Sequence, residues 1–165
     1  GYSKTEIGAI VKTVALGASI LGFFVGGQFI KRFSLKVCLL FGGVLVLITN
    51  LLFSLSALSE SNLTQLSIIV GMDSLAAGFV GTVNIAFLTS LVSKKFTATQ
   101  YALLTSFMML PGKVFSGFSG YLADSLIVLT SLQVGWALFF VITSALTLPA
   151  LITIIIRKDI FKQIS

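Results

Sequence analysis

The chain has 165 residues, of which 56% are hydrophobic and only 10% are charged, and its mean hydropathy is +1.09. A soluble domain carries about 25% charged residues, so this chain has too few to cover a surface that faces water. Its formal net charge is +6, but no dense basic stretch suited to tracking phosphates is present, so we expect no nucleic-acid partner. These features predict an integral membrane protein in contact with lipid.

Apolar segments of membrane-spanning length follow one another along the chain. They cover residues 7–30, 37–58, 63–92, 99–123 and 132–156, and a tail follows over 157–165. A helix needs about 20 apolar residues to cross roughly 30 Å of hydrocarbon, and the segments lack the period-two alternation of membrane-barrel strands. We therefore expect an all-α membrane protein, in which residues 1–165 form one bundle of about five transmembrane helices.

The connections between these segments alternate in charge. The first, third and fifth segments are followed by basic residues, whereas the connections over 59–62 and 124–131 contain Glu60 and Asp124 but no Lys or Arg. The basic residues concerned are Lys31, Arg32, Lys36, Lys94, Lys95, Arg157, Lys158 and Lys162. Because basic loops stay in the cytoplasm, we expect a cytoplasmic C-terminus and an outside N-terminus for this chain. An odd number of helices and a first residue other than Met predict that further helices are missing upstream.

Small residues recur at helical spacing in two of the segments. Gly22 and Gly26 form a small-xxx-small pair in the first segment, and Ser116 and Gly120 form another in the fourth. Such pairs let helix backbones approach closely in lipid. We expect both pairs to pack against neighbouring helices.

The fourth segment also contains Pro111 and Gly112 near its middle. Proline removes one backbone hydrogen bond and bends a helix. This position is a candidate gating kink, although Pro and Gly are both common in membrane helices.

Three ionisable residues, Lys12, Asp73 and Lys113, lie inside apolar segments. A charge near the bilayer centre costs at least about 2.5–3.5 kcal/mol on insertion scales, so we expect them to face the bundle interior. In one interpretation Asp73 is linked to a proton or a substrate, and Lys113 and Lys12 contact an anionic substrate. In the other, Asp73 and Lys113 form a buried ion pair that only sets helix register. Asn84, three helical turns after Asp73, either lines the same cavity or bonds to a neighbouring helix.

This chain has few of the residues that catalysis and metal binding require. Cys38 is the only cysteine and there is no histidine, so a zinc site or a Ser-His-Asp arrangement is not expected. We expect no cofactor, no metal site and no enzyme activity.

The connection over residues 26–36 resembles a known loop signature. It contains Gly26, Gly27, Arg32 and Lys36, and it is similar to a degenerate copy of the Gly-x-x-x-Asp-Arg-x-Gly-Arg-Arg loop of the major facilitator superfamily. Lys31 stands where that signature has Asp.

The chain as a whole resembles the AmpG-type muropeptide permeases of that superfamily. The similarity is carried in order by residues 1–8, by 96–104 and 112–114, and by the pair Gly135-Trp136. The resemblance places Asp73 where these permeases have an acidic residue in helix ten. It implies that the five segments correspond to helices eight to twelve, and that this chain is the C-terminal half without its first helix.

The resemblance also implies a function. AmpG-type permeases use the proton gradient to import anhydromuropeptides, small glycopeptides from cell-wall turnover, across the bacterial inner membrane. A substrate site between two halves would receive only one wall from this chain, so the N-terminal half is an expected partner. Two alternatives remain open, namely a superfamily carrier of another solute and a truncated remnant that does not transport.

Overall fold

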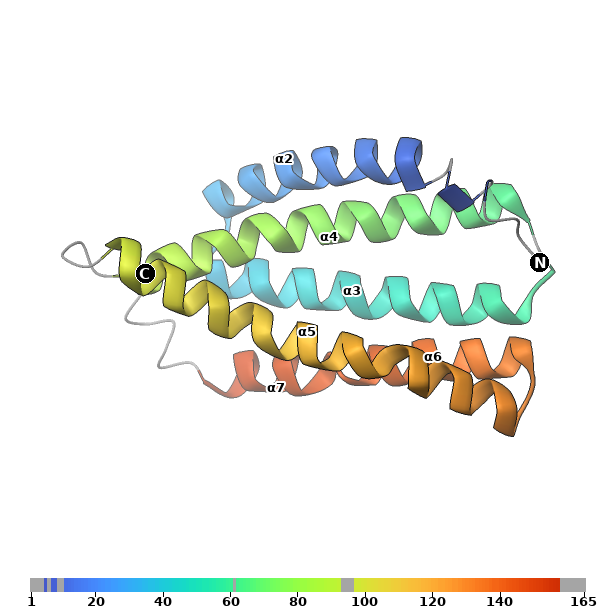
Figure 1. Ribbon diagram of the computed structural model, residues 1–165. Helices are drawn as coiled ribbons and strands as arrows, with labels where there is room; N and C mark the ends of the chain where they lie inside the picture. Colours follow the sequence, from blue (N-terminus) through green and yellow to red (C-terminus); the bar gives the residue numbers. More distant parts are fainter. Residues whose placement is uncertain (1–4, 6, 9–10, 61, 93–96, 158–165) are drawn as a thin grey trace.

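The computed structural model describes residues 5, 7–8, 11–60, 62–92 and 97–157, and nearly all of them are helical. The elements are the π-helical turn η1 (Val11–Ala15) and the α-helices α2 (Leu16–Arg32), α3 (Leu35–Leu58), α4 (Leu63–Leu91), α5 (Thr97–Leu129), α6 (Leu132–Ala145) and α7 (Leu148–Ile156). These described residues contain no β-strand. The helices lie roughly side by side along one axis (Figure 1).

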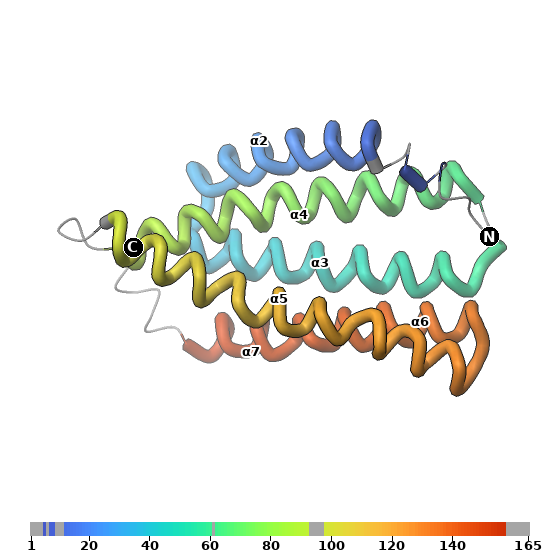
Figure 2. Tube along the Cα trace, viewed as in Figure 1, coloured from blue at the N-terminus to red at the C-terminus, as the bar shows by residue number. Residues whose placement is uncertain are grey.

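Four parts of the described chain are long and apolar enough to cross a membrane. They are Lys12–Arg32, Leu35–Leu58, Leu63–Leu91 and Leu132–Ile156. The chain is therefore an all-α membrane protein. Helix α5 has 33 residues and extends along the bundle beside the others (Figure 2), but Lys113, Asp124 and its many small residues lower its mean hydropathy. Helix α5 is long enough to form the predicted fifth span at residues 99–123, but it is not among the helices that are also apolar enough.

One predicted connection is wrong at residue 124. Asp124, which was predicted to start a connection, lies inside α5, and this helix continues to Leu129. The residues that follow Asp124 are mostly large and apolar, so they extend the helix. The connection to α6 consists of Thr130 and Ser131, and the Ser131 hydroxyl caps α6 by accepting from the Val134 amide at 3.4 Å.

The last predicted segment, residues 132–156, is interrupted. Leu146 and Thr147 form a turn between α6 and α7, and Pro149 lies in the first turn of α7. Proline has no backbone N–H and clashes with the carbonyl four residues before it, here that of Ala145. This explains why α6 ends at Ala145 and a new helix starts.

Helix α4 lies between α2 and α3, α6 packs on α3, and α5 packs mainly on α6 (Figure 1). The contact between α2 and α4 is the tightest because two glycines face each other's helix. A Cβ atom on Gly22 would overlap the Leu75 carbonyl oxygen, and one on Gly78 would overlap the Ser19 carbonyl oxygen. The predicted close contact at Gly22 is confirmed.

The second small-residue pair behaves differently. A Cβ atom on Gly112, Gly117 or Gly120 of α5 would meet nothing within 4 Å. The predicted close contact at Ser116 and Gly120 is therefore wrong for the part of the chain that the structure describes. Helix α5 packs mainly on α6, and Ser116 and Gly120 are both exposed.

Candidate functional site

Asp73 lies on the side of α4 that faces α3. Its side chain is half-buried, and its Oδ1 accepts a hydrogen bond from Thr49 Oγ1 at 2.9 Å. Thr49 is 2% exposed, and its hydroxyl also lies 3.1 Å from the Val46 carbonyl oxygen, within hydrogen-bond reach. The carboxyl group is thus held by a buried neutral hydroxyl. Sequence reasoning missed Thr49, although the Thr49-Asn50 pair is a polar interruption of an apolar segment that could have marked it.

The ion pair between Asp73 and Lys113 is not present. Within the described residues Asp73 makes no salt bridge, and Lys113 is exposed at the centre of α5. Every residue from 106 to 118 is exposed, so no other helix of the described chain covers the middle of α5. The described residues therefore do not form the ion pair of the second interpretation. Helix α5 is continuous through Pro111 and Gly112.

Lys12 lies at the opposite side of α4, in the π-helical turn η1. It lines an open groove together with Ser19 of α2 and Ser74 of α4. Ser74 follows Asp73 directly, so its side chain is rotated by about 100° around α4, away from Thr49. Single π-helical turns inside α-helices occur frequently at functional sites. The groove places one cation and two hydroxyls beside each other, but on a different face from the Asp73 carboxyl.

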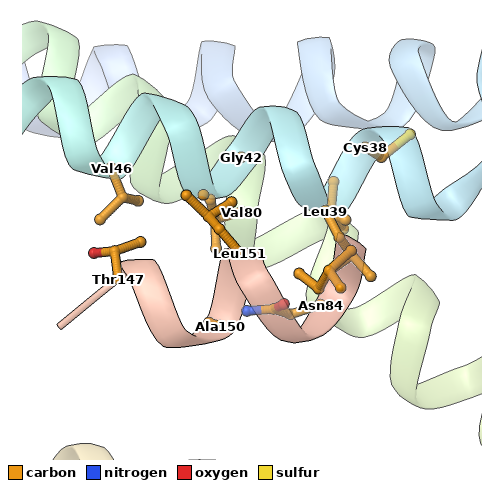
Figure 3. Close-up of a pocket in the computed structure, with 12 residues that line it drawn as sticks. Cys38, Leu39, Gly42, Val46, Val80, Asn84, Thr147, Ala150 and Leu151 are labelled. Carbon is orange, nitrogen blue, oxygen red and sulfur yellow. The ribbon is translucent and has the colours of Figure 1, made fainter. Parts of the chain in front are cut away.

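Asn84 lines a cavity of about 200 Å³ between α3, α4 and α7 (Figure 3). Its side chain extends from α4 toward α7 in this view. Asn84 projects from a similar side of α4 as Asp73, as their spacing predicts, but it lies beside this cavity, whereas Asp73 is hydrogen-bonded to Thr49 of α3. The other residues that line the cavity are Cys38, Leu39, Gly42, Gly43, Val46, Val80, Val83, Thr147, Ala150, Leu151 and Ile154. The cavity is almost entirely apolar, and Asn84 supplies its amide group.

The predicted cytoplasmic loop is much shorter than residues 26–36. Gly26 and Gly27 lie inside α2, which continues to Arg32, and only Phe33 and Ser34 connect it to α3. Gly26 packs on α4, since a Cβ atom there would lie 3.0 Å from the Phe79 carbonyl oxygen, whereas nothing lies within 4 Å at Gly27. The two glycines of the resemblance therefore have different surroundings.

The basic residues near this connection lie at one end of the bundle. Lys36 Nζ donates to the Ile155 carbonyl oxygen at 3.4 Å, so the start of α3 lies beside the end of α7. Lys31, Arg32 and Arg157 end α2 and α7 at the same end (Figure 1). Lys94, Lys95, Lys158 and Lys162, which also entered the topology prediction, lie outside the described residues.

Side-chain hydrogen bonds also join α3 to α6. Thr143 Oγ1 donates to Asn50 Oδ1 at 3.0 Å, and Ser54 Oγ donates to the Ala137 carbonyl oxygen at 2.9 Å. Together with the bond between Thr49 and Asp73, they connect α4, α3 and α6 through polar contacts. Helices α2, α3, α4 and α6 form the central unit of the bundle, and α3, α4 and α6 are thus linked through groups that are costly to leave unpaired in lipid.

Comparisons with known proteins show which proteins this chain is related to. No family model matches the chain. It is 31% identical over 155 residues, 94% of its length, to "Putative transporter AmpG 1" of Rickettsia prowazekii, and 30% identical over 162 residues, 98% of its length, to the protein of the same name from Rickettsia bellii. The chain is homologous to the AmpG-type permeases. It is also 29% identical over 160 residues, 96% of its length, to "Anhydromuropeptide permease" of Escherichia coli.

The alignments cover nearly all of this chain but only part of each relative. The aligned part makes up 33%, 38% and 31% of these three relatives, in the same order. The chain thus spans about a third of the length of the AmpG-type permeases that it matches. Its homologues are named as transporters and permeases, and its own helices support a multi-pass membrane protein.

Proposed function

We propose that this chain forms part of a proton-driven symporter that imports anhydromuropeptides across the bacterial inner membrane and so serves peptidoglycan recycling. The homology with a protein named anhydromuropeptide permease supports the substrate class. The all-helical bundle is compatible with the major facilitator superfamily, whose carriers bind substrate near the midplane between two halves. In this proposal the chain supplies helices eight to twelve.

The observation that carries the proposal is the surroundings of Asp73. The carboxyl group lies 10 residues after the start of α4, about 15 Å along the helix axis, and is bonded to a hydroxyl with no cation beside it in the described part of the chain. A carboxylate tied up in an ion pair resists protonation. Asp73 is held by a neutral hydroxyl and not by such a pair in the described structure, which makes this carboxyl group the candidate for proton coupling in a symporter.

The cations of the chain are the candidates for holding an anionic group of the substrate. Lys12 faces an open groove with Ser74, and Lys113 is exposed on α5. A charged side chain in a membrane segment needs a polar partner or water. We assign both lysines to the substrate pathway, where a carboxylate of the peptide would pair with them, and we place Asn84 as a hydrogen-bonding group of the same pathway.

The chain would act together with further helices, since its relatives are about three times as long. The proposed partner is the remaining part of an AmpG-type permease, on the same or another polypeptide. The loop charges support an orientation in which the basic end of the bundle and the C-terminus face the cytoplasm and the N-terminus of this chain faces the periplasm. The glycopeptide would pass between the two parts.

Uptake of labelled anhydromuropeptide tests this function. The whole transporter that carries this sequence is expressed in cells that lack their own permease, and accumulation is measured with and without a protonophore. We expect accumulation that the protonophore abolishes, and that Asp73→Asn abolishes while the protein still reaches the membrane. Normal accumulation by Asp73→Asn would remove Asp73 from the mechanism. Uptake of a different solute alone would assign the chain to another superfamily carrier, and no uptake of any solute would favour a remnant.

A further inference from the structure

Thr49 is placed to respond to the charge of Asp73. Its hydroxyl oxygen lies 2.9 Å from Asp73 Oδ1 and 3.1 Å from the Val46 carbonyl oxygen. A hydroxyl has one hydrogen to donate and two lone pairs with which to accept. Since Thr49 is 2% exposed, water has little access to it, and these two oxygens compete for its single hydrogen.

The two acceptors suit the two protonation states of the carboxyl group. When Asp73 is ionised, Thr49 donates to Oδ1 in a charge-assisted bond. When a proton from water has added to Asp73, the new carboxyl O–H can donate to Thr49 Oγ1, and the Thr49 hydrogen turns to the Val46 carbonyl. In both states every buried hydrogen has an acceptor, so neither state carries the cost of an unpaired polar group. When the proton returns to water, the hydroxyl turns back.

Other charged groups do not take over this role in the described structure. Of the titratable side chains on elements packed against α4, Lys31, Arg32, Lys36 and Cys38 lie at the basic end of α2 and α3, Lys12 faces the groove at Ser74, and Tyr101, Lys113, Tyr121 and Asp124 are on α5. None of them is bonded to Asp73. Thr49 is the group of the described chain that donates a hydrogen bond to the carboxyl.

We propose that Thr49 is a positioning residue for proton coupling, which hydrogen-bonds Asp73 in both its ionised and its protonated form. The proposal rests on the proposed function, because it assumes that Asp73 is the proton carrier. It adds a residue from a second helix, and it explains how α3 and α4 stay bonded to each other while the proton is taken up and released.

The pH dependence of uptake in Thr49→Val tests this role. Valine has nearly the same shape but no hydroxyl. A charge-assisted hydrogen bond is roughly twice as strong as a neutral one, so its loss disfavours the ionised carboxylate more than the acid. We expect the alkaline limb of the uptake profile to move upward by about half to one pH unit, and the maximal rate to fall because proton release becomes harder.

Matched variants separate this role from a structural one. Thr49→Ser keeps the hydroxyl and should retain the wild-type pH profile. Thr143→Val removes another hydroxyl that bonds between helices, the one that donates to Asn50, and should leave the pH profile where it is. The amount of each variant in the membrane is measured by immunoblot. If Thr49→Val does not reach the membrane, Thr49→Ala takes its place.

The outcomes distinguish the role of Thr49 from proton coupling at Asp73. A wild-type pH profile in the variants that lack the hydroxyl, together with lost accumulation in Asp73→Asn, would overturn the role of Thr49 and leave proton coupling in place. Normal accumulation in Asp73→Asn would overturn proton coupling at Asp73 itself. A shift of equal size in Thr143→Val would show that the effect of Thr49 is only one of packing.

Discussion

Two helices of this bundle, α4 and α5, use similar residues to opposite effect. Helix α4 carries Gly78, whose missing side chain lets the α2 backbone approach directly. Helix α5 carries Gly112, Gly117 and Gly120, and no atom of the described chain lies within 4 Å of where their Cβ atoms would be. Glycine spacing therefore shows where a helix allows close approach, but not whether this chain supplies the partner.

The hydroxyl groups of the two regions differ in the same way. In the central unit, Thr82 of α4 donates to the Phe23 carbonyl of α2 at 3.2 Å, and Ser54 of α3 donates to α6. The serines of α5 donate to carbonyls of α5 itself; these are Ser106, Ser116, Ser119 and Ser125. The central unit thus contains its own partners, whereas the middle of α5 has a small and polar face with none from the described chain.

The largest effect is expected where the helices are closest. Gly78→Ala places a methyl group against the Ser19 carbonyl, and Gly22→Ala does the same against Leu75. Backbone atoms cannot rotate away as a side chain can, so the helices must separate. We expect each variant to lower the free energy of unfolding by about 2–3 kcal/mol, measured by denaturant titration of the protein in detergent micelles.

Gly27→Ala is the matched control for these variants, because it lies on the same helix as Gly22 with nothing within 4 Å. We expect its stability to stay within about 0.5 kcal/mol of wild type. If Gly27→Ala and Gly22→Ala were equally destabilising, close contact between α2 and α4 would not be the source of the effect.

A smaller effect is expected for the polar contacts between helices. Ser54→Ala removes a buried hydroxyl, 6% exposed, that donates to the Ala137 carbonyl. Hydrogen bonds between membrane helices contribute on average about 0.6 kcal/mol, with a maximum near 1.7, and we expect a loss in the upper part of this range. Ser106→Ala on α5 removes a bond within its own helix, and the same titration should show a change of under about 0.5 kcal/mol. A larger loss for Ser106→Ala than for Ser54→Ala would reverse the contrast between the two regions.

The sequence predicted the class of fold well, because length and apolar composition decide whether a segment forms a membrane helix. It also predicted the close contact at Gly22. It could not predict that Asp73 bonds to Thr49 rather than to Lys113, because depth along a helix says nothing about which neighbour faces it. The end of α5 was missed because Asp124 suggested a loop, although the apolar residues after it continue the helix. Which side chains of two helices meet depends on how each helix is rotated about its axis and on which helices are neighbours. The residues of one segment do not determine either.

The smallest effect, and the sharpest test of the comparison, is expected at Gly120. Gly120→Ala adds a methyl group where no atom of the described chain lies within 4 Å, so we expect the free energy of unfolding of this chain to change by less than about 0.5 kcal/mol. In the whole transporter the expectation differs. If the further helices cover the small face of α5, the same methyl group meets a neighbouring backbone, and both muropeptide uptake and resistance to denaturant should fall there. If Gly120→Ala had the same small effect in the whole transporter as in this chain, this face of α5 would contact lipid in both. The partner helices would then meet the chain elsewhere.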